Sequence, residues 1–149
     1  DVVDSVASQL PGPCEGMAMW KDEGDYFMVC SYATWYYPNP MQLHRKRDSL
    51  EGEGSWEFLG DLGEGVFSLI SYNSQPTFVI PWVDHGVFTP IYMGDNWNPN
   101  GPGGVGNASY IWLPMRRHDD PARPWTISYE EGWMPAQMAQ GTDLTTWAY

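Results

Sequence analysis

The segment TFVIPWVDHGVFTPIYMG, residues 77–94, shows most clearly which fold class the chain adopts. Two runs rich in aromatic and β-branched residues, 77–82 and 87–94, flank the turn-forming residues 84–86, and this order is typical of a β-hairpin. Further short runs of the same kind lie at residues 16–20, 25–32, 41–46, 56–59, 109–115 and 125–129. With 16 Gly and 13 Pro, the chain has little room for long helices. We therefore predict an all-β fold.

The predicted strands form two groups of four. In the first group, turn residues lie at 21–24 and 52–54, and in the second at 84–86, 98–106 and 118–121. Two four-stranded antiparallel units in series predict two β-propeller blades, at about residues 14–62 and 66–133, whereas a β-sandwich of eight strands is the alternative. Residues 1–13 are expected to be an N-terminal connection and residues 134–149 a C-terminal tail.

The composition excludes two classes of partner and favours a third. The chain has 19 acidic and 7 basic residues and a formal charge of −12, which argues against binding to nucleic acid. No run of about 18 apolar residues occurs, so we expect no membrane span. Aromatic residues make up 15% of this acidic chain, with 9 Trp and 9 Tyr, which suggests surfaces that face sugars. Because the sequence begins at Asp1, we expect either a processed mature chain or a fragment.

The two cysteines and one sequon bear on the compartment. If the chain folds back around residue 22, Cys14 lies opposite Cys30, at a Cα separation that a disulfide accepts, about 4.5–5.5 Å. A disulfide would indicate an oxidising compartment, and two free buried thiols are the alternative. Asn107 begins an N-glycosylation sequon, which fits a secreted protein.

The spacing of the histidines predicts neither a metal site nor a cofactor. His44, His85 and His118 are far apart, and neither a Cys-x-x-Cys pair nor a His-Glu-x-x-His motif accompanies them. Each is expected to be a surface or turn residue. The Gly-x-Ser-x-Gly motif of a serine nucleophile is also absent from the sequence.

Glu15 is the acidic residue with the most specific setting. It follows Cys14 and precedes the predicted strand 16–20, so a disulfide would fix its backbone at a strand end. Aromatic neighbours there would partly desolvate the carboxyl group and raise its pKa, which suits a general acid. A structural glutamate is the alternative.

Five segments resemble consecutive landmarks of glycoside hydrolase family 43, and most of all its exo-β-1,3-galactanase-like branch. They are PCEGMAMWK (13–21), ATWYYPNP (33–40), SQPTFVIP (74–81), MGDNWNP (93–99) and YIWLPM (110–115), and together they cover roughly residues 12–133. The resemblance implies a secreted five-bladed β-propeller that hydrolyses glycosidic bonds with inversion in a pocket at the propeller axis. The substrate would be a β-linked galactan or a related extracellular polysaccharide.

The resemblance also implies roles for single residues. Glu15 would be the general acid, although this sequence reads Glu-Gly-Met-Ala where the family has a Glu-Ala-Pro-Ala-type motif. Gln75 would replace the usual aspartate base and position the attacking water, as an imidic acid tautomer. Asn96 stands where the family usually has arginine. The expected substrate-binding residues are Trp35, Tyr36, Tyr37, Asp95, Trp97 and Asn98. Packing between blades is the alternative role for Trp35 and Trp97.

The length of the chain leaves two functions open. Five blades need about 300 residues, so some three blades would come from a missing N-terminal part or from another chain. With them, the protein would be a glycosidase that binds a polysaccharide or oligosaccharide. Without catalysis, it would be a propeller-derived carbohydrate-binding or structural protein of an extracellular assembly.

Overall fold

The computed structural model of the chain describes residue 10 and residues 12–51 and 54–133. Most of the predicted N-terminal connection, most of the predicted turn 52–54 and the whole predicted tail 134–149 lie outside the described residues. In the described part, antiparallel sheets dominate, and the two helical segments are short 3-10 turns. The all-β prediction is confirmed.

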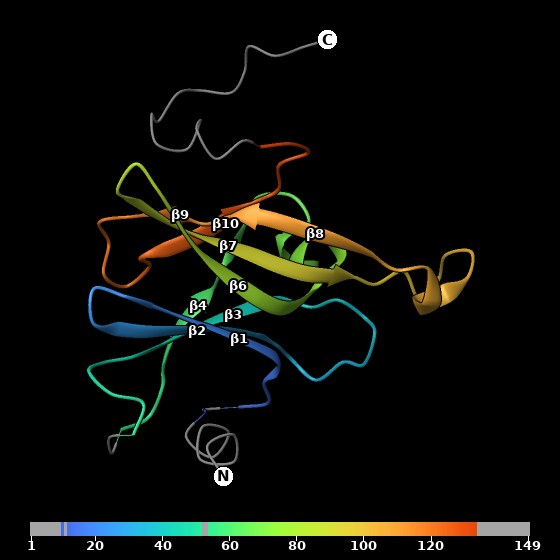
Figure 1. Cartoon of the computed structure of the whole chain (residues 1–149). Helices are drawn as coiled ribbons and strands as arrows, with labels where there is room; N and C mark the ends of the chain where they lie inside the picture. Colours follow the sequence, from blue (N-terminus) through green and yellow to red (C-terminus); the bar gives the residue numbers. More distant parts are fainter. Residues whose placement is uncertain (1–9, 11, 52–53, 134–149) are drawn as a thin grey trace.

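The first sheet has the four strands that the sequence predicts. In chain order they are β1 (Glu15–Asp22), β2 (Asp25–Ser31), β3 (Met41–Lys46) and β4 (Glu57–Asp61). Each strand pairs antiparallel with the next, in the order β1-β2-β3-β4 (Figure 1). The turn between β1 and β2 consists of Glu23 and Gly24, whose φ angles of 47° and 98° are typical of a two-residue hairpin turn.

The second sheet has three strands rather than the predicted four. They are β6 (Gln75–Asp84), β7 (Val87–Asn96) and β8 (Ser109–Pro114). The predicted strand 125–129 exists as β10 (Trp125–Ser128), but it pairs with β9 (Arg116–Arg117) and, in parallel, with β5 (Gly63–Glu64). The β7–β8 ladder ends at this point, because Pro90 lies opposite Met115 and accepts a hydrogen bond from its amide but has no N–H to return one. The chain then resumes as β9 and offers β10 a new partner.

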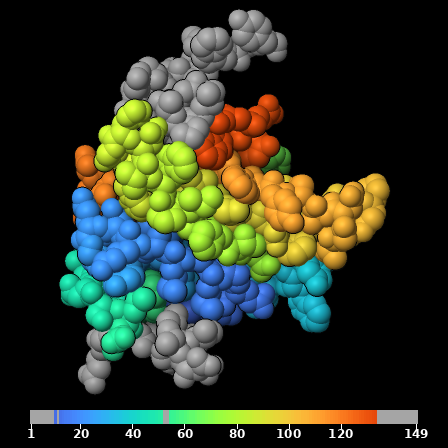
Figure 2. Space-filling model, in the orientation of Figure 1, coloured from blue at the N-terminus to red at the C-terminus, as the bar shows by residue number. Residues whose placement is uncertain are grey.

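The two main sheets lie one above the other in Figures 1 and 2. They share one hydrophobic core. Trp20 of β1 and Phe27 of β2 stack with ring centroids 5.4 Å apart. The ring of Trp125 meets both edge-on, at 6.4 and 6.5 Å, and Phe88 of β7 packs against Trp125 at 6.2 Å. Aromatic burial of this kind is a large source of stabilisation, so the two sheets hold each other in place.

The disulfide between Cys14 and Cys30 is confirmed, with a Cα–Cα distance of 5.4 Å. The register that predicted it is wrong, because the hairpin turns between Asp22 and Asp25 rather than at residue 22. A bulge between Glu15 and Ala18 then shifts β1 by one residue and moves Cys14 closer to Cys30.

Two further sequence-based expectations concern exposed positions. Asn107 lies in η2 (Gly104–Asn107), within the loop that projects from the second sheet in Figures 1 and 2, and it is exposed as a glycosylation site must be. His85 is an exposed turn residue, as expected. His44 is not a surface or turn residue, since only 1% of it is exposed. It lies in strand β3, which is covered on both faces.

None of the helical turns in the described residues is long and apolar enough to cross a membrane.

Candidate functional site

Glu15 and Gln75, 60 positions apart in the sequence, lie close together at the starts of β1 and β6. Between them is Gly16, with a φ of 58°. A Cβ atom at Gly16 would lie 2.5 Å from the carbonyl oxygen of Pro76 and 3.1 Å from Cγ of Gln75. Glycine therefore permits both the bulge and the close approach of the two strands.

Ser31 connects the two candidate catalytic residues. It lies directly opposite Glu15 in the β1–β2 ladder and is 2% exposed. Its hydroxyl group donates to the Glu15 carbonyl oxygen at 3.2 Å and accepts from Nε2 of Gln75 at 3.0 Å. Oε1 of Gln75 accepts from the indole N–H of Trp97 at 3.2 Å. The amide of Gln75 is thus held at both ends, through a serine that the sequence motifs did not single out.

The backbone that leads to Gln75 has an unusual conformation. At the end of η1 (Ser68–Asn73), Tyr72 and Asn73 have φ angles of 54° and 64°, which side-chain-bearing residues rarely adopt. The hydroxyl group of Tyr72 bonds to backbone groups of Glu64 and Ile127, which hold it against the paired strands β5 and β10. Strain that the surrounding structure maintains in this way is common beside functional sites.

Asn96, at the position where the sequence motifs led us to expect an arginine, supports the same segment. Its Oδ1 accepts a hydrogen bond from Nδ2 of Asn73 at 2.9 Å, and the same Nδ2 donates to the Trp97 carbonyl oxygen at 2.8 Å. Asn96 therefore helps to place the loop that carries Trp97, and through it Gln75.

The predicted sugar-binding aromatics lie on a loop beside Trp97. Trp35 is 85% exposed, and Tyr36 and Tyr37 are exposed as well. The ring of Tyr36 meets Trp97 edge-on at 5.2 Å. Asn39 holds the loop, because its side chain bonds to both the amide and the carbonyl group of Tyr32. Exposed aromatic faces of this kind are suited to stacking on the C–H face of a sugar ring.

The remaining predicted residues differ in exposure. Asp95 is half-buried and pairs with Gln75 across the β6–β7 ladder, whereas Asn98 is exposed. Glu15 is also exposed, so the expectation that neighbours partly desolvate its carboxyl group is wrong for this chain. The carboxyl group stands where the strand begins, and no described element covers it.

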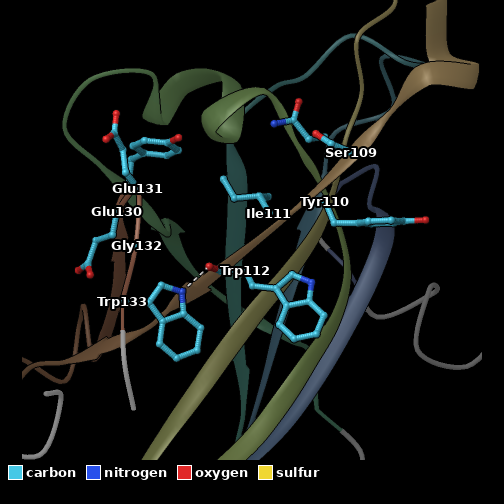
Figure 3. Close-up of a pocket in the computed structure, with 10 residues that line it drawn as sticks. Ser109, Tyr110, Ile111, Trp112, Glu130, Glu131, Gly132 and Trp133 are labelled. Atoms are coloured by element: carbon cyan, nitrogen blue, oxygen red, sulfur yellow. Dashed lines mark hydrogen bonds between the residues drawn. The ribbon is translucent and has the colours of Figure 1, made fainter. Parts of the chain in front are cut away.

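A hollow of about 450 Å³ lies beside β8 (Figure 3). Strand β7 separates β8 from β6, the strand that carries Gln75. Tyr110 and Trp112 of β8 line it together with Glu130 and Trp133. The indole N–H of Trp133 donates to the Trp112 carbonyl oxygen at 2.7 Å, drawn as a dashed line in Figure 3. Aromatic side chains with a few polar groups are a common lining of ligand pockets. Tyr110 and Trp112 belong to the segment YIWLPM, which carried part of the family resemblance, but the sequence did not predict this hollow.

Comparisons with known proteins give matches among solved structures. No protein-family model matches the chain, and a search of curated proteins gives no match either. Among solved structures, the GH43 β-1,3-galactosidase BT3683, with galactodeoxynojirimycin, has a TM-score of 0.68 and 28% identity. The match covers 80% of this chain and 32% of that one.

Two other enzymes agree with this match. The GH43 β-1,3-galactosidase BT0265 has a TM-score of 0.68 and 25% identity, over 85% of this chain and 25% of that chain. The exo-β-1,3-galactanase 1,3Gal43A from Clostridium thermocellum has a TM-score of 0.62 and 28% identity, over 78% of this chain and 23% of that chain. The chain thus spans a third or less of the length of these enzymes. It shares its fold with part of the propeller of the GH43 β-1,3-galactosidases and exo-β-1,3-galactanases, and the resemblance drawn from its sequence motifs is confirmed.

Proposed function

We propose that the chain is part of a secreted inverting glycoside hydrolase that acts on β-linked galactan or a related extracellular polysaccharide. The observation that carries the proposal is the meeting of Glu15 and Gln75 at Gly16, where the Ser31 hydroxyl group bonds to the main-chain carbonyl group of Glu15 and to the side-chain amide of Gln75. An inverting enzyme needs an acid and a group that holds water on opposite sides of the scissile bond, about 6.5–9.5 Å apart. Glu15 and Gln75, at the starts of β1 and β6, would supply these two groups.

Glu15 is the general acid in this proposal. Its exposed carboxyl group donates a proton to the leaving glycosidic oxygen, and bulk water restores that proton after the product leaves. Two of the three following residues, Gly16 and Met17, differ from the family motif, but Gly16 has a structural reason, since a side chain there would collide with Pro76.

Gln75 positions the attacking water. A carbonyl oxygen has two lone pairs, and Trp97 occupies one on Oε1, so the second is available to accept a hydrogen bond from water. Because an amide is a weak base, Oε1 takes up the proton released by the water as Nε2 gives up one of its own protons to bulk water, and Gln75 becomes its neutral imidic acid tautomer. The resemblance to the galactanase-like branch implies this tautomer. Ser31 and Trp97 restrain the side chain so that this water meets the anomeric carbon in line.

The substrate side of the proposal rests on the aromatic loop and its neighbours. Trp35, Tyr37 and Trp97 form stacking surfaces for galactose rings, Tyr36 supports Trp97, and Asp95 and Asn98 offer polar contacts to sugar hydroxyl groups. The matched enzymes are named as β-1,3-galactosidases and exo-β-1,3-galactanases, which supports a β-1,3-linked galactan as the substrate. The disulfide and the exposed sequon at Asn107 support secretion, and further blades or another chain would complete the propeller.

The test is the variant Glu15→Gln in the complete protein, assayed on β-1,3-galacto-oligosaccharides. A general acid typically contributes about 10²–10⁴ in rate, so hydrolysis should fall by at least about 100-fold while oligosaccharide binding is retained. Glu51→Gln, which removes the same charge from an exposed loop, is the matched control and should leave turnover unchanged. Undiminished turnover by Glu15→Gln would contradict the assignment.

A non-catalytic function is the second candidate, and the exposure of Glu15 favours it, because an effective acid at neutral pH is usually partly desolvated. In that case the complete protein binds galactan through Trp35 and Tyr37 but releases no sugar, before or after the Glu15→Gln change. NMR analysis of the first products separates the candidates. An inverting enzyme releases the anomer opposite to that of the substrate, whereas a non-catalytic protein releases no sugar.

A further inference from the structure

Three side chains with metal-binding atoms meet beneath the start of the first sheet. They are Cys14, Cys30 and His44, and their sulfur and ring nitrogen atoms all lie within 4.8 Å of one another. Cys30 pairs with Gln42 in the β2–β3 ladder, and His44 is two residues further along β3, so the two side chains are diagonal neighbours on one face. Cys30 and His44 are 0% and 1% exposed.

His44 is held without a hydrogen bond. Neither of its ring nitrogens has a partner among the described residues, and the ring lies against Phe58 with centroids 5.4 Å apart. Buried polar atoms are nearly always paired, so an imidazole in this position needs an explanation. Burial also lowers the pKa of His44 to about 4, which keeps the ring neutral, with a free lone pair on one nitrogen.

We propose that reduction of the Cys14–Cys30 disulfide converts this cluster into a site for Zn²⁺, with both cysteine sulfurs and one nitrogen of His44 as ligands. Thiolate and imidazole are the ligands that zinc prefers, at about 2.3 and 2.0 Å, and in a tetrahedral site such atoms are about 3.5–3.8 Å apart. The spacing within the cluster needs only small side-chain movements to meet that geometry. The fourth position is left for water or an added ligand.

The disulfide and the zinc site exclude each other. A dithiol reductant transfers two electrons and two protons to the Cys14–Cys30 bond and becomes a disulfide itself, leaving two thiols. Zn²⁺ then displaces one proton from each thiol, because only the thiolate form is a ligand, and two protons are released. In either form a cross-link ties the residue before Glu15 to β2. The chain thus keeps this strand end fixed in reducing and in oxidising surroundings.

The experiment is a titration of the full chain with Zn²⁺ alone, after reduction with a dithiol and removal of the reductant without oxygen. We expect one zinc ion per reduced chain, and no binding at this site by the oxidised chain. Co²⁺ in place of Zn²⁺ should give thiolate-to-metal charge-transfer absorption, which Cys14→Ser abolishes. His44→Leu should weaken zinc binding by more than about tenfold, since even indirect support of a ligand is worth about 10–100-fold. His85→Leu, at an exposed histidine, is the matched control and should bind as the unaltered chain does.

A measurement on the unaltered chain makes the test independent of whether variants fold. The ring nitrogens of His44 should shift in ¹⁵N NMR spectra when one equivalent of Zn²⁺ is added to the reduced chain. The proposal is overturned if the reduced chain binds no zinc, if His44→Leu binds as tightly as His85→Leu, or if the His44 resonances stay unchanged at saturation.

Discussion

Acidification should destabilise the folded chain through a single buried histidine, His44. Burial lowers the pKa of His44 from 6.5 to about 4 in the folded state. At any pH between these two values, His44 is therefore largely protonated in the unfolded chain and largely neutral in the folded chain. The contribution of the neutral His44 to the free energy of unfolding is fully present above pH 6.5 and is lost as the pH falls toward 4. One pKa unit corresponds to about 1.4 kcal/mol, so the loss in free energy of unfolding is about 3 kcal/mol.

The assay is equilibrium unfolding in urea at several pH values between 7.5 and 4, with the oxidised chain and its His44→Leu variant. Leucine fills a similar space beside Phe58 and Met28 and does not titrate, so the variant should lose much less stability on acidification. Burial raises the pKa of Asp22 and of Asp61, an effect of the opposite sign, but both groups are present in the two proteins and cancel in the difference. His85→Leu is the control for removal of an exposed histidine. An equal loss of stability in His44→Leu and in the unaltered chain would refute the reasoning.

Three further substitutions test the arrangement around the candidate site. Gly16→Ala places a Cβ atom 2.5 Å from the Pro76 carbonyl oxygen, on a residue whose φ is 58°. The free energy of unfolding, measured in urea, should therefore fall by more than about 1 kcal/mol. An unchanged unfolding midpoint would show that the strands move apart freely. Trp97→Phe keeps an aromatic ring but removes the hydrogen bond to Gln75, so kcat of the complete protein on β-1,3-galacto-oligosaccharides should fall about tenfold with little change in KM. A change in KM alone would instead indicate a role in binding. Tyr72→Phe deletes the hydroxyl group that bonds to three backbone groups and should cost about 1–3 kcal/mol in urea unfolding, whereas a cost near zero would mean that water replaces the hydroxyl group.

The strands were predictable because their signal is local. The hairpin 77–94 has alternating branched and aromatic residues on both sides of a turn at His85 and Gly86, both with positive φ, and it forms as expected. The partner of β10 was not predictable, since pairing with β5 and β9 depends on where the chain meets itself in space. Such long-range contacts leave no periodic pattern in the sequence.

The candidate site was predictable only in part, for a similar reason. Motifs identified Glu15 and Gln75, but the residue that links them, Ser31, is an ordinary serine at the end of a strand. The sequence also gave no sign that His44 would be buried. Strand β3 is central in its sheet and is covered on both faces, so that Arg45 is buried too and bonds to Glu57 and to the Pro121 carbonyl oxygen.

The parallel pairing of β10 with β5 has a consequence for the order of events during synthesis. All four strands of the first sheet are complete once Asp61 has been made, and each pairs with its neighbour in sequence. The backbone of residues 62–64, however, waits for Ile127 and Ser128, which emerge from the ribosome several seconds later at about 5–20 residues per second. Contacts between distant residues also form more slowly than local ones. A ribosome that stalls before residue 125 should therefore hold a nascent chain whose first sheet is formed but whose link to the second sheet is still open to chaperones and proteases.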